Sequence, residues 1–180
     1  MQIIGLGHKA RQGKDTFGRF LAQEAATRGM NVRVYGFADS LRAYCRVAFG
    51  MRGKDAPLLQ VVGTDIFRKR DPDIWCRVLV DTIEEQQPDL AIVTDVRFEN
   101  EAGVIKALGG KLFKVSRLQV SQDPTLNGSP WVAGDRDPKH PSETALDNFN
   151  GWDMHFTVDD GDMDQLQSIA RGLFQMGVIQ

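Results

Sequence analysis

The stretch that decides the fold is "GLGHKARQGKDTFG", residues 5–18. It follows the apolar run "MQIIGL" (residues 1–6) and leads into a segment whose apolar residues recur at helical spacing, at Phe17, Leu21 and Ala25. A strand, a glycine-containing loop and a helix in this order are typical of a phosphate-binding loop. In such a loop, backbone N–H groups and the start of the helix converge on phosphate oxygens while a lysine adds a point charge. Gly13 and Lys14 stand where the pattern G-x-x-x-x-G-K-[ST] requires them.

Two positions of the loop depart from that pattern. His8 occupies the place of the first glycine, and Asp15 occupies the place of the magnesium-binding hydroxyl. The imidazole of His8 either contacts a triphosphate or only replaces the missing turn residue. Asp15 can ligate magnesium, cap the helix or face an acceptor phosphate, with Thr16 supplying a hydroxyl, but a simple helix N-terminal charge is the plainer interpretation.

Composition indicates one soluble α/β domain spanning residues 1–180. Lys and Arg total 22 against 24 Asp and Glu, so the chain lacks the excess of positive charge with which proteins coat nucleic acid. No stretch reaches the ~20 apolar residues of a membrane span, and a cytoplasmic location is expected. Cys45 and Cys76 fall in amphipathic helical patterns without metal-ligand spacing, so both are predicted to be reduced core residues.

Strand and helix patterns alternate along the chain. Strands are predicted at "VRVYGF" (32–37), "DLAIVTD" (89–95), "KLFKVSR" (111–117) and "MHFTVDD" (154–160), with helical patterns between them. This alternation predicts a mainly parallel sheet with helices on both faces, and ligands then bind at the carboxyl ends of the strands. The aperiodic stretch 119–141 is too long for an ordinary connection, so it is either a functional loop or an insertion.

Several charged residues are candidates for binding phosphates: some lie just past predicted strands, Arg68 and Arg70 lie in the helical patterns of residues 55–86, and Arg136 lies in the long loop. They are Asp39, Arg42, Arg68, Arg70, Asp95, Arg97, Arg117 and Arg136. A solvated surface position is the ordinary interpretation of any one arginine, but those just past a strand end lie where a phosphate chain would be. The segment "TDVRFENE" (94–101) is the strongest candidate, because an acidic and a basic residue directly follow the most apolar strand.

Taken in order, "GHKARQGKDT", "FADSLR", "LLQVVGTDIFRKRDPDIW", "VTDVRFENEAGVIKALGGKLFKVSR" and "HPSETAL" resemble the phage-type deoxynucleoside monophosphate kinases of the P-loop kinase superfamily. The resemblance spans roughly residues 1–150. It implies a three-layer P-loop kinase fold with a lid insertion, ATP as phosphoryl donor, Mg²⁺, and a deoxynucleoside monophosphate (dNMP) as acceptor. It also implies a possible homodimer, located in the host cytoplasm if the protein is phage-encoded.

The resemblance assigns residues to each part of such a site. ATP would be bound by Lys9, Ala10, Arg11, Gln12, Gly13, Lys14, Asp15 and Thr16. Catalytic roles would fall to Lys14, Asp15, Asp95, Arg97 and Arg136, with Asp15 and Asp95 as metal ligands. The acceptor would lie in a helical region of about 39–86, on Asp39, Arg42, Thr64, Arg68, Arg70, Trp75 and Arg97. A lid would span about 118–141.

Some alternatives remain open at this stage. Trp75 either stacks on a base or belongs to the core through Val78 and Leu79, and Glu143 in "HPSE" either completes a capping pattern or binds an arginine. The function could instead be that of another small-molecule P-loop kinase, of the dephospho-coenzyme A or phosphomevalonate type. A non-catalytic nucleotide-binding module is the third possibility, kept open by His8.

Overall fold

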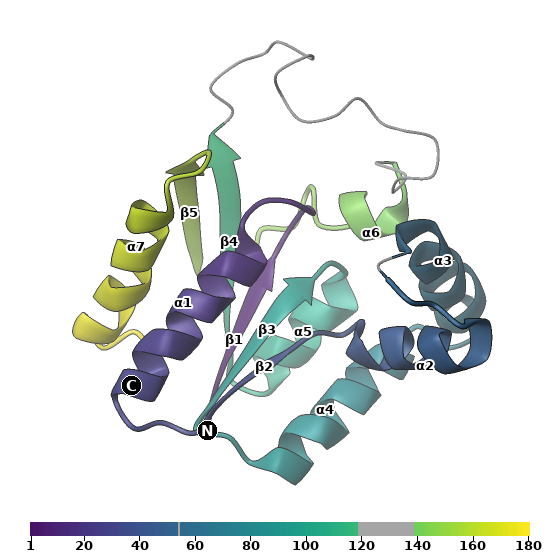
Figure 1. Ribbon diagram of the computed structural model, residues 1–180, viewed down its shortest axis with the longest axis horizontal. Helices are drawn as coiled ribbons and strands as arrows, with labels where there is room; N and C mark the ends of the chain where they lie inside the picture. The colour runs from purple at the N-terminus through teal and green to yellow at the C-terminus, as the bar shows by residue number, and fades with distance from the viewer. Residues whose placement is uncertain (54, 119–138) are drawn as a thin grey trace.

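The computed structural model describes residues 1–53, 55–118 and 139–180. In this part of the chain five parallel strands form one sheet, in the order β2-β3-β1-β4-β5 (Figure 1). The strands are β1 (Gln2–Gly7), β2 (Val32–Tyr35), β3 (Leu90–Val96), β4 (Lys111–Leu118) and β5 (Met154–Asp159). The predicted parallel sheet is therefore confirmed, and β3 is a central strand, as its apolar sequence indicated.

Helices cover both faces of the sheet and create two hydrophobic cores. The helices are α1 (Lys14–Thr27), α2 (Asp39–Phe49), α3 (Ala56–Gln60), α4 (Ile74–Gln86), α5 (Glu99–Ala107), α6 (Pro141–Thr144) and α7 (Met163–Gln175). Successive residues of a strand point to opposite faces, so Ile3 packs in the core under α2, α4 and α5, while Ile4 packs in the core under α1 and α7. The result is the predicted three-layer α/β architecture (Figure 1).

Helix α1 lies unusually close to β3. A Cβ atom built on Gly18 would come within 2.6 Å of Cγ2 of Thr94, so this position requires a glycine. The close approach brings the N-terminal end of α1 beside the end of β3, where Thr94 and Asp95 lie. A glycine in the first helix thus determines how near the β1–α1 loop lies to the acidic strand end.

The region predicted as two helical patterns folds as α3, a π-helical segment η1 (Val61–Arg68) and α4. In η1 the backbone departs from the regular i to i−4 hydrogen-bond ladder, and such segments are frequent at functional sites. The indole Nε1 of Trp75 donates a hydrogen bond of 3.1 Å to the Gly63 carbonyl of this segment. This bond ties η1 to α4.

The predicted core positions of the two thiols are confirmed, because Cys45 and Cys76 are both buried. Among the described residues, no helix combines the length and apolar content needed to cross a bilayer. Arg136 and most of the predicted lid at 118–141 lie outside the described residues.

Candidate active site

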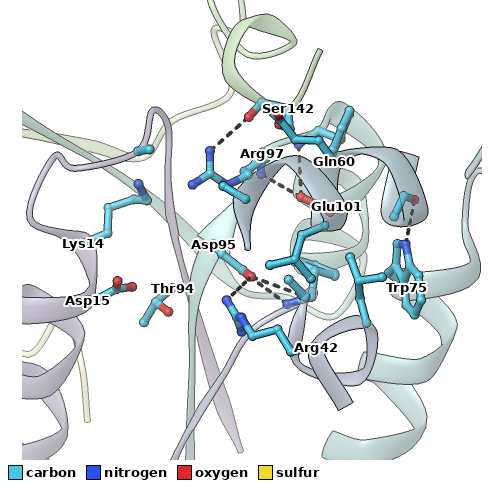
Figure 2. Close-up of a pocket in the computed structure, with 18 of the residues that line it drawn as sticks. Lys14, Asp15, Arg42, Gln60, Trp75, Thr94, Asp95, Arg97, Glu101 and Ser142 are labelled. Atoms are coloured by element: carbon cyan, nitrogen blue, oxygen red, sulfur yellow. Dashed lines mark hydrogen bonds and ion pairs between the residues drawn. The ribbon is translucent and has the colours of Figure 1, made fainter. Parts of the chain in front are cut away.

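A cavity of about 450 Å³ lies at the carboxyl ends of the strands. Its walls come from the loop after β1, the start of α1, the β2–α2 connection, α3 with η1, the end of β3 and the start of α6. Figure 2 shows Lys14 and Asp15 on one side of it and Trp75 on the other, with Asp95 and Arg97 between them. Segments far apart in the sequence therefore meet at the edge of the sheet where ligands of such folds bind.

The β1–α1 loop has the backbone of an anion-binding loop. Gly13 caps α1 in the left-handed conformation, with φ of 90°, and Arg11 is also left-handed, with φ of 61°. Alternation of this kind turns successive N–H groups toward a common point, and the positive end of α1 faces the same way. The Nζ of Lys14 donates to the Lys9 carbonyl, so the lysine folds back over the loop.

Lys14 is 5% exposed, and the pKa of its ammonium group is lowered to about 8. Burial is the main cause and the nearby Arg97 guanidinium adds to it, whereas Asp15, Glu143 and Asp95 oppose the shift. An anion bound on the loop would reverse much of this cost, since it would neutralise the buried charge.

His8 points away from the cavity. Its Nε2 lies 2.8 Å from Oδ1 of Asp147, and its ring meets Trp152 at an angle of 62° with centroids 6.4 Å apart. Lys9, predicted to bind ATP, also turns to Asp147, at 2.9 Å. This geometry favours the second interpretation of His8, in which it replaces the turn residue and anchors the loop to the segment that follows α6.

Asp95 organises the connection between β2 and α2. Its Oδ1 accepts from Phe37 N–H at 2.7 Å, and its Oδ2 accepts from Ala38 N–H at 3.1 Å. Burial raises the pKa of this carboxyl, against the opposing effects of those two N–H groups and of Arg42. A Cβ on Gly36 would come within 2.8 Å of Oδ2, so the connection can approach the carboxylate only as glycine. Asp95 thus holds the β2–α2 connection against the end of β3 through two backbone hydrogen bonds.

Glu101 is the main residue of this site that sequence reasoning missed. It is 1% exposed, forms an ion pair with Arg68, and accepts from the N–H groups of Arg97 (2.7 Å) and Phe98 (3.1 Å). Burial raises its pKa to about 7, while Arg68 works in the opposite direction. At the start of α5 the Glu101 side chain accepts from the N-cap N–H of Phe98, but Phe98 has no polar side chain, so the sequence contains no capping-box pattern that would have indicated this role.

Arg68 and Arg42 bring positive charge to the cavity wall formed by α2 and η1. The guanidinium of Arg68 lies 4.3 Å from the ring centroid of Phe98, and its Nη1 donates to the Pro72 carbonyl at 3.3 Å. Arg42 pairs with Asp39, one turn before it on α2. Asp39 in turn accepts from Gly36 N–H at 2.7 Å, so it supports the connection and does not line the cavity.

The cavity wall also has an apolar part, to which Phe37, Leu41, Leu59 and Trp75 contribute. Trp75 is 5% exposed and packs against Phe67, which favours the core interpretation of this residue. Gln60 is buried in the same wall and was not predicted. Thr64 lines the same wall, so uncharged hydrogen-bonding groups accompany the arginines there.

Most predicted site residues that the structure describes line the cavity. These are Ala10, Arg11, Gln12, Gly13, Lys14, Asp15, Thr16, Arg42, Thr64, Arg68, Trp75, Asp95 and Arg97. Lys9, Asp39 and Arg70 do not line it; Arg70 is an exposed residue beyond η1. Arg117, noted only for its position after a strand, does line it, and its N–H donates to Oε1 of Gln12 at 2.8 Å.

Comparisons with known proteins agree with this architecture. No protein-family model matches the chain. It is 26% identical over 189 residues to a protein of Acanthamoeba polyphaga mimivirus named "Putative deoxynucleotide monophosphate kinase", covering 86% of each chain. It is 40% identical over 50 residues to the deoxynucleoside-5'-monophosphate kinase of Escherichia phage T5, covering 27% of this chain and 20% of that one.

Among solved structures, an unliganded sugar kinase from Janibacter sp. HTCC2649 aligns with a TM-score of 0.50 and 14% sequence identity, over 98% of this chain and 94% of that one. At this identity the likeness concerns the fold alone. The chain thus shares a three-layer α/β fold with this kinase, and the resemblance to deoxynucleoside monophosphate kinases, first indicated by its motifs, is confirmed by relatives named as deoxynucleotide or deoxynucleoside monophosphate kinases, one of them from a phage.

Proposed function

We propose that this kinase transfers the γ-phosphoryl group of ATP, with Mg²⁺, to deoxynucleoside monophosphates. One observation carries the proposal. A single cavity receives Lys14 and the N–H groups of the anion-binding loop from one side, and Arg42 and Arg68 from the other, with Arg97 between them. Cations on two opposed walls suit two phosphorylated ligands placed end to end.

The proposed reaction is an in-line displacement. A phosphate oxygen of the dNMP forms a bond to the γ-phosphorus of ATP, and the bond from that phosphorus to the β,γ-bridging oxygen breaks, so that ADP and a dNDP result. Catalysis of this step consists mainly of positioning and charge neutralisation. Lys14 holds the β- and γ-phosphates, Arg97 neutralises charge between the nucleotides, and Arg68 with Arg42 holds the acceptor phosphate.

The donor set fits a magnesium ion. Asp15, Thr16, Thr94 and Asp95 present carboxylate or hydroxyl oxygens along the same cavity, and Mg²⁺ is usually held by one or two carboxylates together with substrate phosphates and water. Among the described residues, no group of three or more His, Cys, Asp or Glu side chains forms a metal site. This suits an ion that arrives with ATP. When bound, it would neutralise charge on the phosphates.

A coupled ADP-release assay with ATP, Mg²⁺ and each of the four common dNMPs tests the proposal. We expect ADP release that depends on a dNMP and that Lys14→Ala reduces by about 100-fold or more, because removing a charge that acts on the transition state typically costs several kcal/mol. Lys106→Ala is the matched control, since Lys106 pairs with Asp153 on the surface and lies outside the cavity.

Two results would overturn the assignment. ADP release with none of the dNMPs, while ATP still binds, would exclude these acceptors and direct the search to other phosphorylated metabolites. ADP release that is equal in Lys14→Ala and the wild type would exclude the loop as the ATP site.

A further inference from the structure

Glu143 lies outside the cavity wall but touches both parts of the proposed donor site. It is 8% exposed and belongs to α6, far along the chain from the loop and from β3. Its Oε2 accepts from Ala10 N–H at 3.0 Å, and its Oε1 accepts from Nη1 of Arg97 at 2.7 Å. One buried carboxylate therefore joins the anion-binding loop to the arginine that stands between the nucleotides.

The guanidinium of Arg97 is held by α6. Its Nη1 also donates to the Ser142 carbonyl at 3.1 Å, so α6 provides two acceptors for a single nitrogen. Figure 2 shows the guanidinium extending from Arg97 toward Lys14, with Ser142 above it. The contacts fix the direction of the guanidinium and leave its remaining N–H groups on the cavity side. The backbone of Arg97 is held as well, because its N–H donates to Oε2 of Glu101.

We infer that Glu143 is a positioning residue for phosphoryl transfer, which acts through Arg97 and sets the position of this arginine relative to the anion-binding loop. The inference rests on the proposed function. Its physical basis is that a buried ion pair with charge-assisted hydrogen bonds has a defined geometry, whereas a long arginine side chain without a partner samples many rotamers. The paired guanidinium needs little rearrangement when the phosphates bind.

Glu143→Gln tests whether one side chain must hold the loop and Arg97 together, because an amide presents one acceptor oxygen where the carboxylate presents two. The variant keeps the side-chain volume but can serve either Ala10 N–H or Arg97, not both. We expect kcat to fall by about 10- to 100-fold, since small misplacements of catalytic groups cost rate to this extent. We expect KM for the dNMP to stay within about two-fold of the wild type, because uniform binding of the acceptor is unchanged.

Asp147→Asn is the matched control for loop anchoring. It weakens the contacts of His8 and Lys9 with Asp147 but leaves the pair of Glu143 and Arg97 in place. We expect this variant to retain kcat while KM for ATP rises. Equal losses of kcat in both variants, or a wild-type kcat in Glu143→Gln with only a lower melting temperature, would overturn the inference, because Glu143 would then be merely structural.

A double-mutant cycle adds a readout that stability does not affect. If Glu143 acts through Arg97, kcat of Glu143→Gln combined with Arg97→Lys should match that of Arg97→Lys alone. Losses of kcat that multiply in the double variant would contradict the inference.

If the wild type transfers phosphate to none of the dNMPs, the proposed function fails. The inference is then decided by ATP binding, where Glu143→Gln should weaken the affinity at least about three-fold through Ala10 and an equal affinity would overturn it.

Discussion

Burial of Lys14 has a cost that varies with pH. The pKa of its ammonium group falls from 10.5 to about 8 on folding, so the folded chain binds fewer protons than the unfolded chain between these pH values. Stability therefore rises as the pH increases through this window, because the charged lysine is least favourable in the folded state below pH 8. Burial of the charged Lys14 is thus destabilising until an anion lies beside it.

ATP affinity should fall as the pH rises, whereas the stability of the free protein increases. A bound triphosphate stabilises the ammonium form, so binding above pH 8 requires uptake of a proton by Lys14. We expect the dissociation constant of ATP to be nearly constant between about pH 7 and 8 and then to rise up to about ten-fold per pH unit. Isothermal titration calorimetry in buffers of different ionisation enthalpy would measure both the affinity and the proton uptake.

Lys14→Arg is the control for this pH dependence, because a guanidinium stays charged throughout the range. It should bind ATP more weakly than the wild type but with a flat profile above pH 8. A decline of the same steepness in Lys14→Arg would assign the titration to another group.

The packing of α1 against β3 gives a second prediction. Gly18→Ala would place a methyl group 2.6 Å from Cγ2 of Thr94, a β-branched side chain with little room to move. Overpacking of this kind costs about 1–3 kcal/mol, which exceeds the gain in helix propensity of up to about 1 kcal/mol. We expect a lower free energy of unfolding in urea and weaker ATP binding, since α1 must move away from β3.

Gly103→Ala is the matched variant in another helix. At Gly103, on α5, the described residues place no atom within 4 Å of an added Cβ. The same substitution should therefore stabilise the chain by about 0.5–1 kcal/mol. A stabilised Gly18→Ala, or similar effects at both positions, would mean that the contact with Thr94 does not limit the approach of α1.

The two hydrophobic cores share a single sheet, so the predicted single domain should unfold as one cooperative unit. Ile105 is fully buried on one face and Leu173 is 1% exposed on the other. Truncating either to alanine should cost about 2–5 kcal/mol, and the double variant should lose about the sum, since the sites are separated by the sheet. Each variant should shift the same transition.

Two spectroscopic probes can test this cooperativity. Trp75 and Trp152 lie with the core on the side of α4 and α5. In a Trp131→Phe background, which removes the third tryptophan, fluorescence reports on that face, whereas far-UV circular dichroism reports on all helices. We expect the two urea transitions to coincide in the wild type and in both variants. Separate midpoints in Leu173→Ala would show that the faces unfold independently and that the chain is not one domain in this sense.

The alternation of strands and helices could be predicted from the sequence because it depends on local periodicity. The apolar run at residues 89–95 predicted a buried strand, and the loop ending in Gly13 and Lys14 predicted an anion-binding site, because each pattern is contiguous in the chain. The parallel-sheet rule then predicted the edge at which the site residues meet. Most of the predicted residues accordingly line one cavity.

Partners distant in the sequence could not be predicted in this way. The sequence motifs indicated Arg97 and Asp95 as site residues. The tertiary structure shows that Glu143 and Glu101 hold Arg97. It also shows that Asp95 holds the backbone of residues 37 and 38. Likewise, the pattern left His8 and Lys9 as candidates for phosphate contact, and the structure pairs both with Asp147. A charged side chain has no periodicity, so its partner is decided by which segments the tertiary packing brings within hydrogen-bonding distance.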